Sequence, residues 1–264
     1  MSEDADQDRQ QDIRQEAELI ELCRRLVEAA KEKGAVLRAL GAVAFRIHCP
    51  KYKAIEYEAG RYLTDVDMAT YFSQLDKVEK VFTEAGFVQD ERLKLHGAGR
   101  RVFYSTTSDW HSDIFVDELS FCHTVSFKGR LEADYPTIPL AELLLEKLQI
   151  VSFEPKDCLD SFVLLREHPV GDSDEETINA GVIVRTCADD WGWWKTVDMN
   201  LGRIEEFAKS LPYGITAADR DDVLGKIEEL KRRIEAAPKS LKWKMRARVG
   251  TKRPWYQEVD DLAR

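Results

Sequence analysis

The sequence contains no apolar run long enough to cross a membrane, and it has few cysteines. A membrane-spanning helix needs about 20 consecutive apolar residues, and a signal peptide is basic and then apolar. This chain instead opens with the acidic run Met-Ser-Glu-Asp-Ala-Asp-Gln-Asp. Its five cysteines are odd in number and include no Cys-x-x-Cys pair, which predicts reduced, buried thiols. We therefore expect a cytoplasmic protein that makes no membrane contact.

Positive charge is also in deficit. Lysine and arginine number 39 against 49 acidic residues, and the net charge is −10. Such a protein is a poor candidate for coating nucleic acid non-specifically, because the phosphate backbone attracts cations. A phosphate-bearing ligand held through metal ions stays compatible with this charge.

Hydrophobic periodicity divides the 264 residues into three parts. Residues 1–11 are charged and have no apolar anchor, which predicts disorder. Residues 12–136 mix helical periodicity with short strand-like runs, and residues 137–264 are helical, with a basic tail. Within the first of these parts we expect a polar loop at residues 51–60 and a strand at residues 87–95. Within the second, Pro155 and Thr216 are expected to begin helices. The sequence thus predicts an α+β fold, in which a mixed β-sheet flanked by helices is followed by a C-terminal helical bundle.

An apolar run at residues 61–70 contains two aspartates, Asp65 and Asp67. In a strand, side chains two residues apart share a face, so both carboxylates point one way while Val66 and Met68 face the core. Neighbouring carboxylates repel each other unless a cation neutralises them, and Mg²⁺ is typically held by one or two carboxylates plus substrate phosphates. For an isolated Asp-x-Asp pair, a solvated strand edge is the commoner interpretation.

Two other positions strengthen the metal hypothesis. Asp113 lies in a later strand-like run, residues 112–116, and supplies the third carboxylate that a two-metal site requires. Gly41 stands where a strand at residues 36–40 gives way to a helix, a place where backbone can approach an anion. Asp117 lies where its strand ends, and we expect it to cap a turn.

The second half contains three features of interest. The apolar helix predicted at residues 138–151 carries one lysine, Lys147, which must reach solvent or meet a partner. The cluster at residues 189–194 holds three tryptophans, which we interpret as helix packing first and a base-stacking platform second. The tail at residues 239–253 has seven basic residues and no acidic one, and a strap over the acidic body is favoured over a phosphate or RNA contact.

In order along the chain, the Gly41-Ala42 turn, the Asp65-x-Asp67 strand, Asp113 and the helical second half resemble the nucleotidyltransferase superfamily, with its polymerase-β-like fold. The family pattern is Gly-Gly or Gly-Ser, then Asp-x-Asp, then a third Asp. The chain is similar in particular to bacterial and archaeal nucleotidyltransferases of the antibiotic-modifying and abortive-infection-toxin types, over about residues 36–165. It departs from the pattern at Ala42, and in the 23 residues that separate Gly41 from Asp65.

The resemblance implies transfer of a nucleoside monophosphate from a nucleoside triphosphate to an acceptor hydroxyl, with release of pyrophosphate. Two Mg²⁺ ions, or Mn²⁺, would be held by three catalytic carboxylates, and four further residues would contact the nucleotide or its neighbours. The carboxylates are Asp65, Asp67 and Asp113. The other four are Gly41 and Ala42 for the phosphates through their backbone, Lys147 for the β- or γ-phosphate, and Asp157, which matches the motif and whose role stays open between catalysis and either capping a helix or orienting Lys147. The acceptor stays open between a small molecule, an RNA and a protein.

Three alternatives remain at this point. A catalytically inert nucleotidyltransferase-fold module, binding a nucleotide or a partner, is favoured by Ala42 and opposed by the three carboxylates. A different metal site is conceivable from His48, Cys49, His111, Cys122 and His123, but the spacing matches no structural zinc pattern and packing roles are favoured. The third alternative is a nucleic-acid binder that uses the basic tail.

Overall fold

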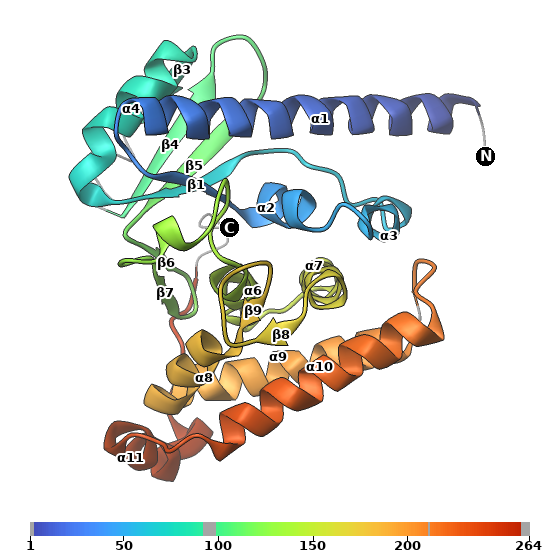
Figure 1. The fold of residues 1–264 in the computed structure, drawn as a ribbon, viewed down its shortest axis with the longest axis vertical. Coiled ribbons are helices and arrows are strands. Elements are labelled where there is room, and N and C mark those ends of the chain that lie inside the picture. Colours follow the sequence, from blue (N-terminus) through green and yellow to red (C-terminus); the bar gives the residue numbers. More distant parts are fainter. Residues whose placement is uncertain (1–2, 92–98, 211, 260–264) are drawn as a thin grey trace. The chain divides into compact units, whose positions relative to one another are not determined.

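The structure, a computed structural model, describes residues 3–91, 99–210 and 212–259 (Figure 1). By its internal contacts the chain divides into two compact units. Unit 1 comprises Met1–Pro50, Gly60–Leu119 and Ser126–Ile138, and unit 2 comprises Lys51–Ala59, Ser120–Val125 and Pro139–Arg264. Among the helices of the described residues, none is both long and apolar enough to cross a membrane.

Unit 1 is a five-stranded mixed sheet flanked by helices, which confirms the predicted α+β class. Across the sheet, the strands are β1 (Leu37–Leu40), β2 (Asp67–Thr70), β5 (His111–Val116), β4 (Arg100–Ser105) and β3 (Phe87–Gln89). Strands β2 and β5 run parallel, and the other neighbours are antiparallel. The helices are α1 (Glu3–Glu32), α2 (Gly41–His48) and α4 (Leu75–Glu84), with 3₁₀ turns at Phe72–Gln74 and Leu131–Ala133.

Helix α1 covers part of this sheet through one apolar stripe. The stripe recurs every three or four residues, as one face of a helix requires, and all its members are buried: Leu19, Leu22, Cys23, Leu26, Val27 and Ala30. The helix packs against β1, α2 and α4. One turn before this stripe, toward the N-terminus of α1, the buried Glu16 accepts two hydrogen bonds from Arg46 of α2, at 2.6 and 2.7 Å. This enclosed pair fixes α2, and with it the turn at Gly41, against α1.

Unit 2 is helical apart from short strand pairs. In chain order its helices are α3 (Lys53–Glu58), α6 (Leu140–Leu148), α7 (Pro155–Glu167), α8 (Ala180–Asp189), α9 (Trp191–Lys209), α10 (Ala217–Ala236) and α11 (Leu241–Val249), with a 3₁₀ turn at Gly250–Lys252. The strands β8 (Val170–Gly171) and β9 (Ile178–Asn179) pair in parallel. Strands β6 (Glu118–Ser120) and β7 (Thr124–Ser126) form a separate two-stranded sheet where the two units adjoin in the sequence.

The helix starts in unit 2 follow from local chemistry. Pro155 occupies the first turn of α7, where its missing N–H costs nothing, and Glu154 and Asp157 form a reciprocal capping box. Thr216 and Asp219 form a second capping box at the start of α10. Helix α6 is central, since all its residues from Leu140 to Leu148 are buried. These starts confirm the predictions at Pro155 and Thr216.

Three segments differ from the sequence predictions. Helix α1 begins at Glu3, so residues 3–11 are helical where disorder was predicted. Once a helix is nucleated, extending it costs little, and acidic residues near its N-terminus suit the positive end of the helix dipole. The predicted loop at residues 51–60 contains the short helix α3, which buries Ile55 and Glu56. The strand predicted at residues 87–95 ends at Gln89, and residues 92–95 lie outside the described residues. The basic tail contains a regular helix, α11.

Candidate functional site

The register between β2 and β5 brings two of the predicted carboxylates to neighbouring positions. Met68 pairs with Ile114 in this parallel ladder, so Asp67 and Asp113, each one residue earlier, stand at the same level of adjacent strands. Side chains at equivalent positions of a parallel pair point to the same face of a sheet. Asp67 and Asp113 therefore project from one face at neighbouring positions.

Asp65 lies two residues before β2 begins, and it continues the alternation of buried and exposed side chains along that strand. Val66 and Met68 are buried, at 1% and 0% exposure, whereas Asp65 and Asp67 are partly exposed. The Val66 N–H donates to the carbonyl of His111, which extends the pairing beyond the regular strand. The carboxylate of Asp65 lies 3.8 Å from His111 Nε2. The predicted opposition of Asp65 and Asp67 to Val66 and Met68 is thus confirmed by the burial pattern.

Gly41 packs directly beneath Asp67. Leu40, the last residue of β1, pairs with Asp67 across the antiparallel ladder, and Gly41 follows as the first residue of α2. Gly41 has a φ of +67°, a left-handed conformation that glycine adopts without steric cost. A Cβ on Gly41 would come 2.7 Å from Asp67 Oδ2, closer than side chains tolerate. Leu40 supplies no side-chain cap to α2, and Ala42 is partly exposed in its first turn.

The Asp113 carboxylate is held by a basic side chain that belongs to none of the predicted motifs. Its Oδ2 accepts a hydrogen bond from the guanidinium of Arg100, on the adjacent strand β4. The same guanidinium lies over the ring of Phe115, 5.7 Å from its centroid. Because Arg100 pairs with Phe115 in the β4–β5 ladder, it reaches Asp113 along the diagonal of the sheet. This role depends on the register between β4 and β5, which the sequence pattern does not specify.

The arrangement has both favourable and unfavourable features for a divalent cation. Asp113 Oδ1 is buried and accepts no hydrogen bond from the described residues, so a cation that reached the site would meet an unsatisfied carboxylate oxygen. Across residues 3–91, 99–210 and 212–259, however, no group of three or more His, Cys, Asp and Glu side chains is placed to hold a metal ion. Mg²⁺ in nucleotide sites commonly takes one or two carboxylates and completes its shell with phosphate and water. Asp67 and Asp113 fit such a shared site.

Lys147 and Asp157 belong to unit 2, where they form a buried ion cluster. The Lys147 ammonium lies 2.9 Å from Asp160 Oδ2 and 3.5 Å from Asp157 Oδ1, and all three side chains are at most 11% exposed. Asp157 also accepts from the Glu154 N–H in the capping box of α7. Lys147 therefore meets partners rather than solvent, and Asp157 both caps its helix and orients Lys147.

The histidine and cysteines considered for another metal site, and Asp117, make contacts within the folded chain or are buried in it. His48 hydrogen-bonds Thr137 and lies 3.4 Å from Asp134, and all five cysteines are buried free thiols. Burial raises the pKa of the Cys23 thiol to about 12 and that of Cys187 to about 12. Asp117 has a φ of 64° and accepts from the Phe72 N–H at 3.0 Å, which confirms its predicted turn.

Comparisons with known proteins leave the family open. No family model matches the chain, and no curated protein matches it. Among solved structures, the solution structure of the antibiotic-resistance factor ANT(2'')-Ia is similar with a TM-score of 0.39 and 14% sequence identity. The match covers 66% of this chain and 95% of that one. A similarity of this size does not place the chain in a family.

Proposed function

We propose that unit 1 is a metal-dependent nucleotidyltransferase that moves a nucleoside monophosphate from a nucleoside triphosphate to an acceptor hydroxyl and releases pyrophosphate. The observation that carries the proposal is the parallel register of β2 and β5, which sets Asp67 beside Asp113, with Gly41 packed under Asp67. The order of these elements along the chain is the order of the motifs in the superfamily that the sequence resembles. The support is the geometry of the site combined with that order.

In this proposal each residue of the site has a distinct task. Asp67 and Asp113 would hold Mg²⁺, and Asp65 would join them from the position two residues before β2. The bound cation supplies neutralisation of charge on the transferred phosphoryl group. Gly41 keeps the backbone close to Asp67, and the first turn of α2, including Ala42, presents its amides to a phosphate. Lys147 is paired with Asp157 and Asp160 in unit 2, so this proposal gives it no task at the phosphates.

Positioning is the main contribution that such a site makes. Phosphoryl and nucleotidyl transfers need little covalent chemistry from the protein, so alignment and charge stabilisation supply the rate. The sheet suits this task, because a parallel strand pair fixes the separation of two carboxylates more firmly than a loop does. Arg100 must leave Asp113 Oδ2 before that oxygen can bind a cation.

The test is transfer of label from α-³²P-labelled nucleoside triphosphates with Mg²⁺. Each of the four triphosphates is incubated with the protein and one acceptor pool: a small-molecule extract, total RNA, or the protein itself. Labelled product in one pool, lost in Asp67→Asn and retained in Asp76→Asn, supports the proposal. Asp76 is an exposed aspartate of α4 and serves as the charge-matched control. Absence of labelled product in every pool contradicts it.

One observation favours a second function, a catalytically inert module that binds a nucleotide or partner. Arg100 already neutralises Asp113, and the described residues contain no group of three or more ligands placed for a metal. An inert module would bind nucleoside triphosphate equally with Mg²⁺ or with a chelator, and it would release no pyrophosphate. Metal-dependent binding together with transfer would exclude it.

A further inference from the structure

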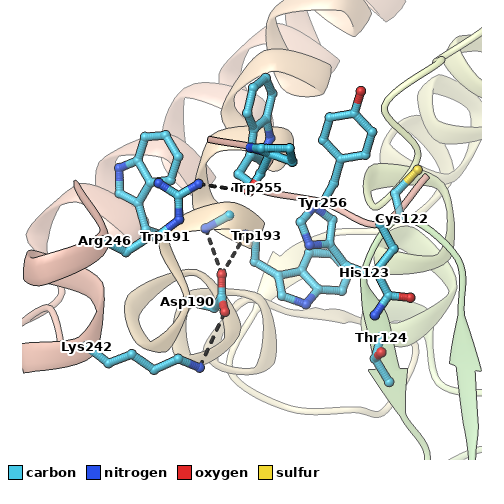
Figure 2. A pocket seen from close by; sticks show the side chains of 13 residues that line it. Cys122, His123, Thr124, Asp190, Trp191, Trp193, Lys242, Arg246, Trp255 and Tyr256 are labelled. Carbon is cyan, nitrogen blue, oxygen red and sulfur yellow. Dashed lines mark hydrogen bonds and ion pairs between the residues drawn. The ribbon is translucent and has the colours of Figure 1, made fainter. Parts of the chain in front are cut away.

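Unit 2 contains a cavity of about 440 Å³ that plays no part in the proposed transfer. It opens between the end of the β6–β7 hairpin, the start of α9, helix α11 and the C-terminal segment (Figure 2). Its volume falls within the range of about 300–1,000 Å³ that small-molecule sites occupy. Residues of the tryptophan cluster and residues of the basic tail, two separate features of the sequence, therefore line the same cavity.

Aromatic rings form the walls. Trp191 and Trp193 are each 7% exposed, and their faces are engaged: the Arg246 guanidinium lies 4.9 Å from the Trp191 centroid, and His123 stacks on Trp193 at 4.8 Å. Trp255 and Tyr256 are only half-buried. Trp255 meets Trp191 at 81° and Tyr256 at 75°, so within the described part of the chain no ring stacks face to face on either. These two rings remain suitable for a planar ligand.

Hydrogen bonds within the chain hold the walls in place. The Arg246 guanidinium donates to the carbonyls of Gly250, Arg253 and Pro254, and the Gln257 N–H donates to the carbonyl of Cys122. A Cβ on Gly192 would come 2.4 Å from the carbonyl oxygen of Trp255, so the segment passes in direct contact with the start of α9. A preformed wall lowers the entropic cost of binding, because these residues need not be ordered when the ligand enters.

A second set of hydrogen bonds fixes the rings themselves. Trp255 Nε1 donates to the hydroxyl of Thr196 at 3.1 Å, and His123 Nε2 lies 2.8 Å from the same hydroxyl. Burial lowers the pKa of His123 to about 4, with Asp190 acting in the opposite direction. The imidazole is therefore neutral at neutral pH, and it adds no positive charge to the wall.

The rim carries one acceptor and one donor. Asp190 Oδ1 caps α9 by accepting from the N–H groups of Gly192 and Trp193, which leaves Oδ2 facing the Lys242 ammonium at 3.5 Å (Figure 2). The Lys242 side chain is 73% exposed, and an ion pair with so much exposure contributes little. Lys242 can therefore turn to an incoming anion, while Asp190 Oδ2 can accept from a ligand N–H.

We propose that this cavity is a nucleotide-binding site, with the base against Trp255 and Tyr256, a base N–H donated to Asp190, and the phosphate bound by Lys242. The ligand is a free nucleotide or the terminal nucleotide of a single strand, since both present a base and a phosphate. An aliphatic ligand would desolvate Asp190 and Lys242 without compensation. A cation would be repelled by Lys242 and Arg246, and a duplex keeps its bases stacked inside.

The site does not depend on the proposed transfer, and its test keeps the two apart. The full chain is titrated with the four nucleoside 5′-monophosphates in the presence of a chelator, and binding is followed by calorimetry and tryptophan fluorescence. Ribose 5-phosphate is titrated alongside to ask whether the base is needed. Nucleotide binding that persists in Asp67→Asn, with no binding of ribose 5-phosphate, is the expected result. Failure of the transfer proposal would leave this binding unchanged.

Two positions on α11 give a matched pair of variants. Lys242 lines the cavity, whereas Lys244 is exposed on the same helix and does not. Lys242→Ala is expected to weaken nucleotide binding several-fold, since the phosphate loses its charged partner and an exposed ion pair contributes about 0.2–1 kcal/mol. Lys244→Ala is expected to change it little. Tyr256→Leu keeps the apolar volume but removes the ring face, and it too should weaken binding, with the melting temperature checked to show that the fold is intact.

Binding of oligonucleotides shows whether the ligand is a free nucleotide or the end of a single strand. Three are compared: a short single-stranded RNA, the matching single-stranded DNA and an RNA duplex of the same length. Tighter binding of a single strand than of a mononucleotide identifies a strand end as the ligand, and RNA against DNA distinguishes the sugar. Equal loss in Lys242→Ala and Lys244→Ala, or equal binding of the duplex, would overturn the proposal in favour of general attraction to a basic helix. The proposal would also be overturned if no nucleotide binds. Anionic lipid vesicles are tested alongside, and binding of vesicles alone, through the exposed Leu241 and Met245, would overturn it too.

Discussion

Asp67 Oδ2 lies so close to the backbone of Gly41 that a Cβ at Gly41 would approach it to 2.7 Å. The contact joins the end of β1 to the strand that carries the Asp65-x-Asp67 pair. It gives a physical reason for glycine at this position that is independent of any family pattern: the site carboxylate occupies the space of a side chain.

Gly41→Ala should therefore disturb both stability and the site. The variant carries the left-handed backbone cost, about 1–2 kcal/mol, plus the collision with Asp67. Gly60→Ala is the matched control, because its φ of +69° is nearly the same and nothing lies within 4 Å of the added Cβ. Urea unfolding should show a larger loss of unfolding free energy for Gly41→Ala. Equal losses would show that Asp67 yields without cost.

Arg100→Gln should raise the affinity of the site for divalent cations. The substitution frees Asp113 Oδ2 from its ion pair, so a cation no longer competes with a guanidinium. Titration with Mn²⁺, followed by electron paramagnetic resonance, is expected to show affinity several-fold tighter than in the wild type. Arg101→Gln, on the same strand but paired with Glu79 at 3.4 Å, should leave the affinity unchanged. Unchanged Mn²⁺ affinity in Arg100→Gln would show that this ion pair does not limit metal binding.

Lys147→Met should be strongly destabilising, because it removes the ammonium that lies beside the buried carboxylates of Asp157 and Asp160. Breaking a buried ion pair by removing one partner costs about 3–5 kcal/mol. Lys156→Met removes a lysine whose pair with Glu154 is about half exposed, and it should cost at most about 1 kcal/mol. Chemical denaturation of the two variants makes the comparison. Similar midpoints would mean that the cluster at Lys147 contributes little to folding.

His123 should make the protein less stable as the pH falls. Burial lowers its folded-state pKa to about 4, whereas an unfolded histidine titrates near about 6.5. Between these values the unfolded chain binds the proton and the folded chain does not, so acidification from pH 7 to pH 4 costs up to about 3 kcal/mol, and the loss levels off below pH 4. Nuclear magnetic resonance of the histidine Hε1 signals measures the pKa directly. A midpoint near 6.5 for His123 would contradict the burial argument.

The parts of the fold that were predictable are those decided by local chemistry. The alternation of apolar and acidic residues around Val66 predicted which face of the strand carries Asp65 and Asp67. Pro155 and Thr216 predicted where two helices begin. In each case the deciding interaction lies within a few residues of the chain. Gly41 was identified for the same reason, although its contact with Asp67 was not.

The parts that were missed depend on pairing between distant segments. Arg100 reaches Asp113 only because of the β4–β5 register, and the loop at residues 51–60 forms α3 because Ile55 is buried within unit 2. The cavity of unit 2 shows the same limit. Its tryptophans were predicted to pack, and Trp191 and Trp193 do, but the return of the C-terminal segment to Cys122 leaves no local trace in the sequence.

The most direct test of the central claim is calorimetric titration of the nucleoside triphosphates into wild type and Asp65→Asn, with Mg²⁺ or with a chelator. Any nucleotide bound in the cavity of unit 2, as proposed above, would bind without metal and equally in both proteins. The difference between binding with Mg²⁺ and binding with the chelator therefore isolates the carboxylates of unit 1. The account predicts binding to the wild type that depends on Mg²⁺ and falls about tenfold or more in Asp65→Asn, with melting temperatures unchanged. Identical binding by both proteins, with or without Mg²⁺, would contradict it.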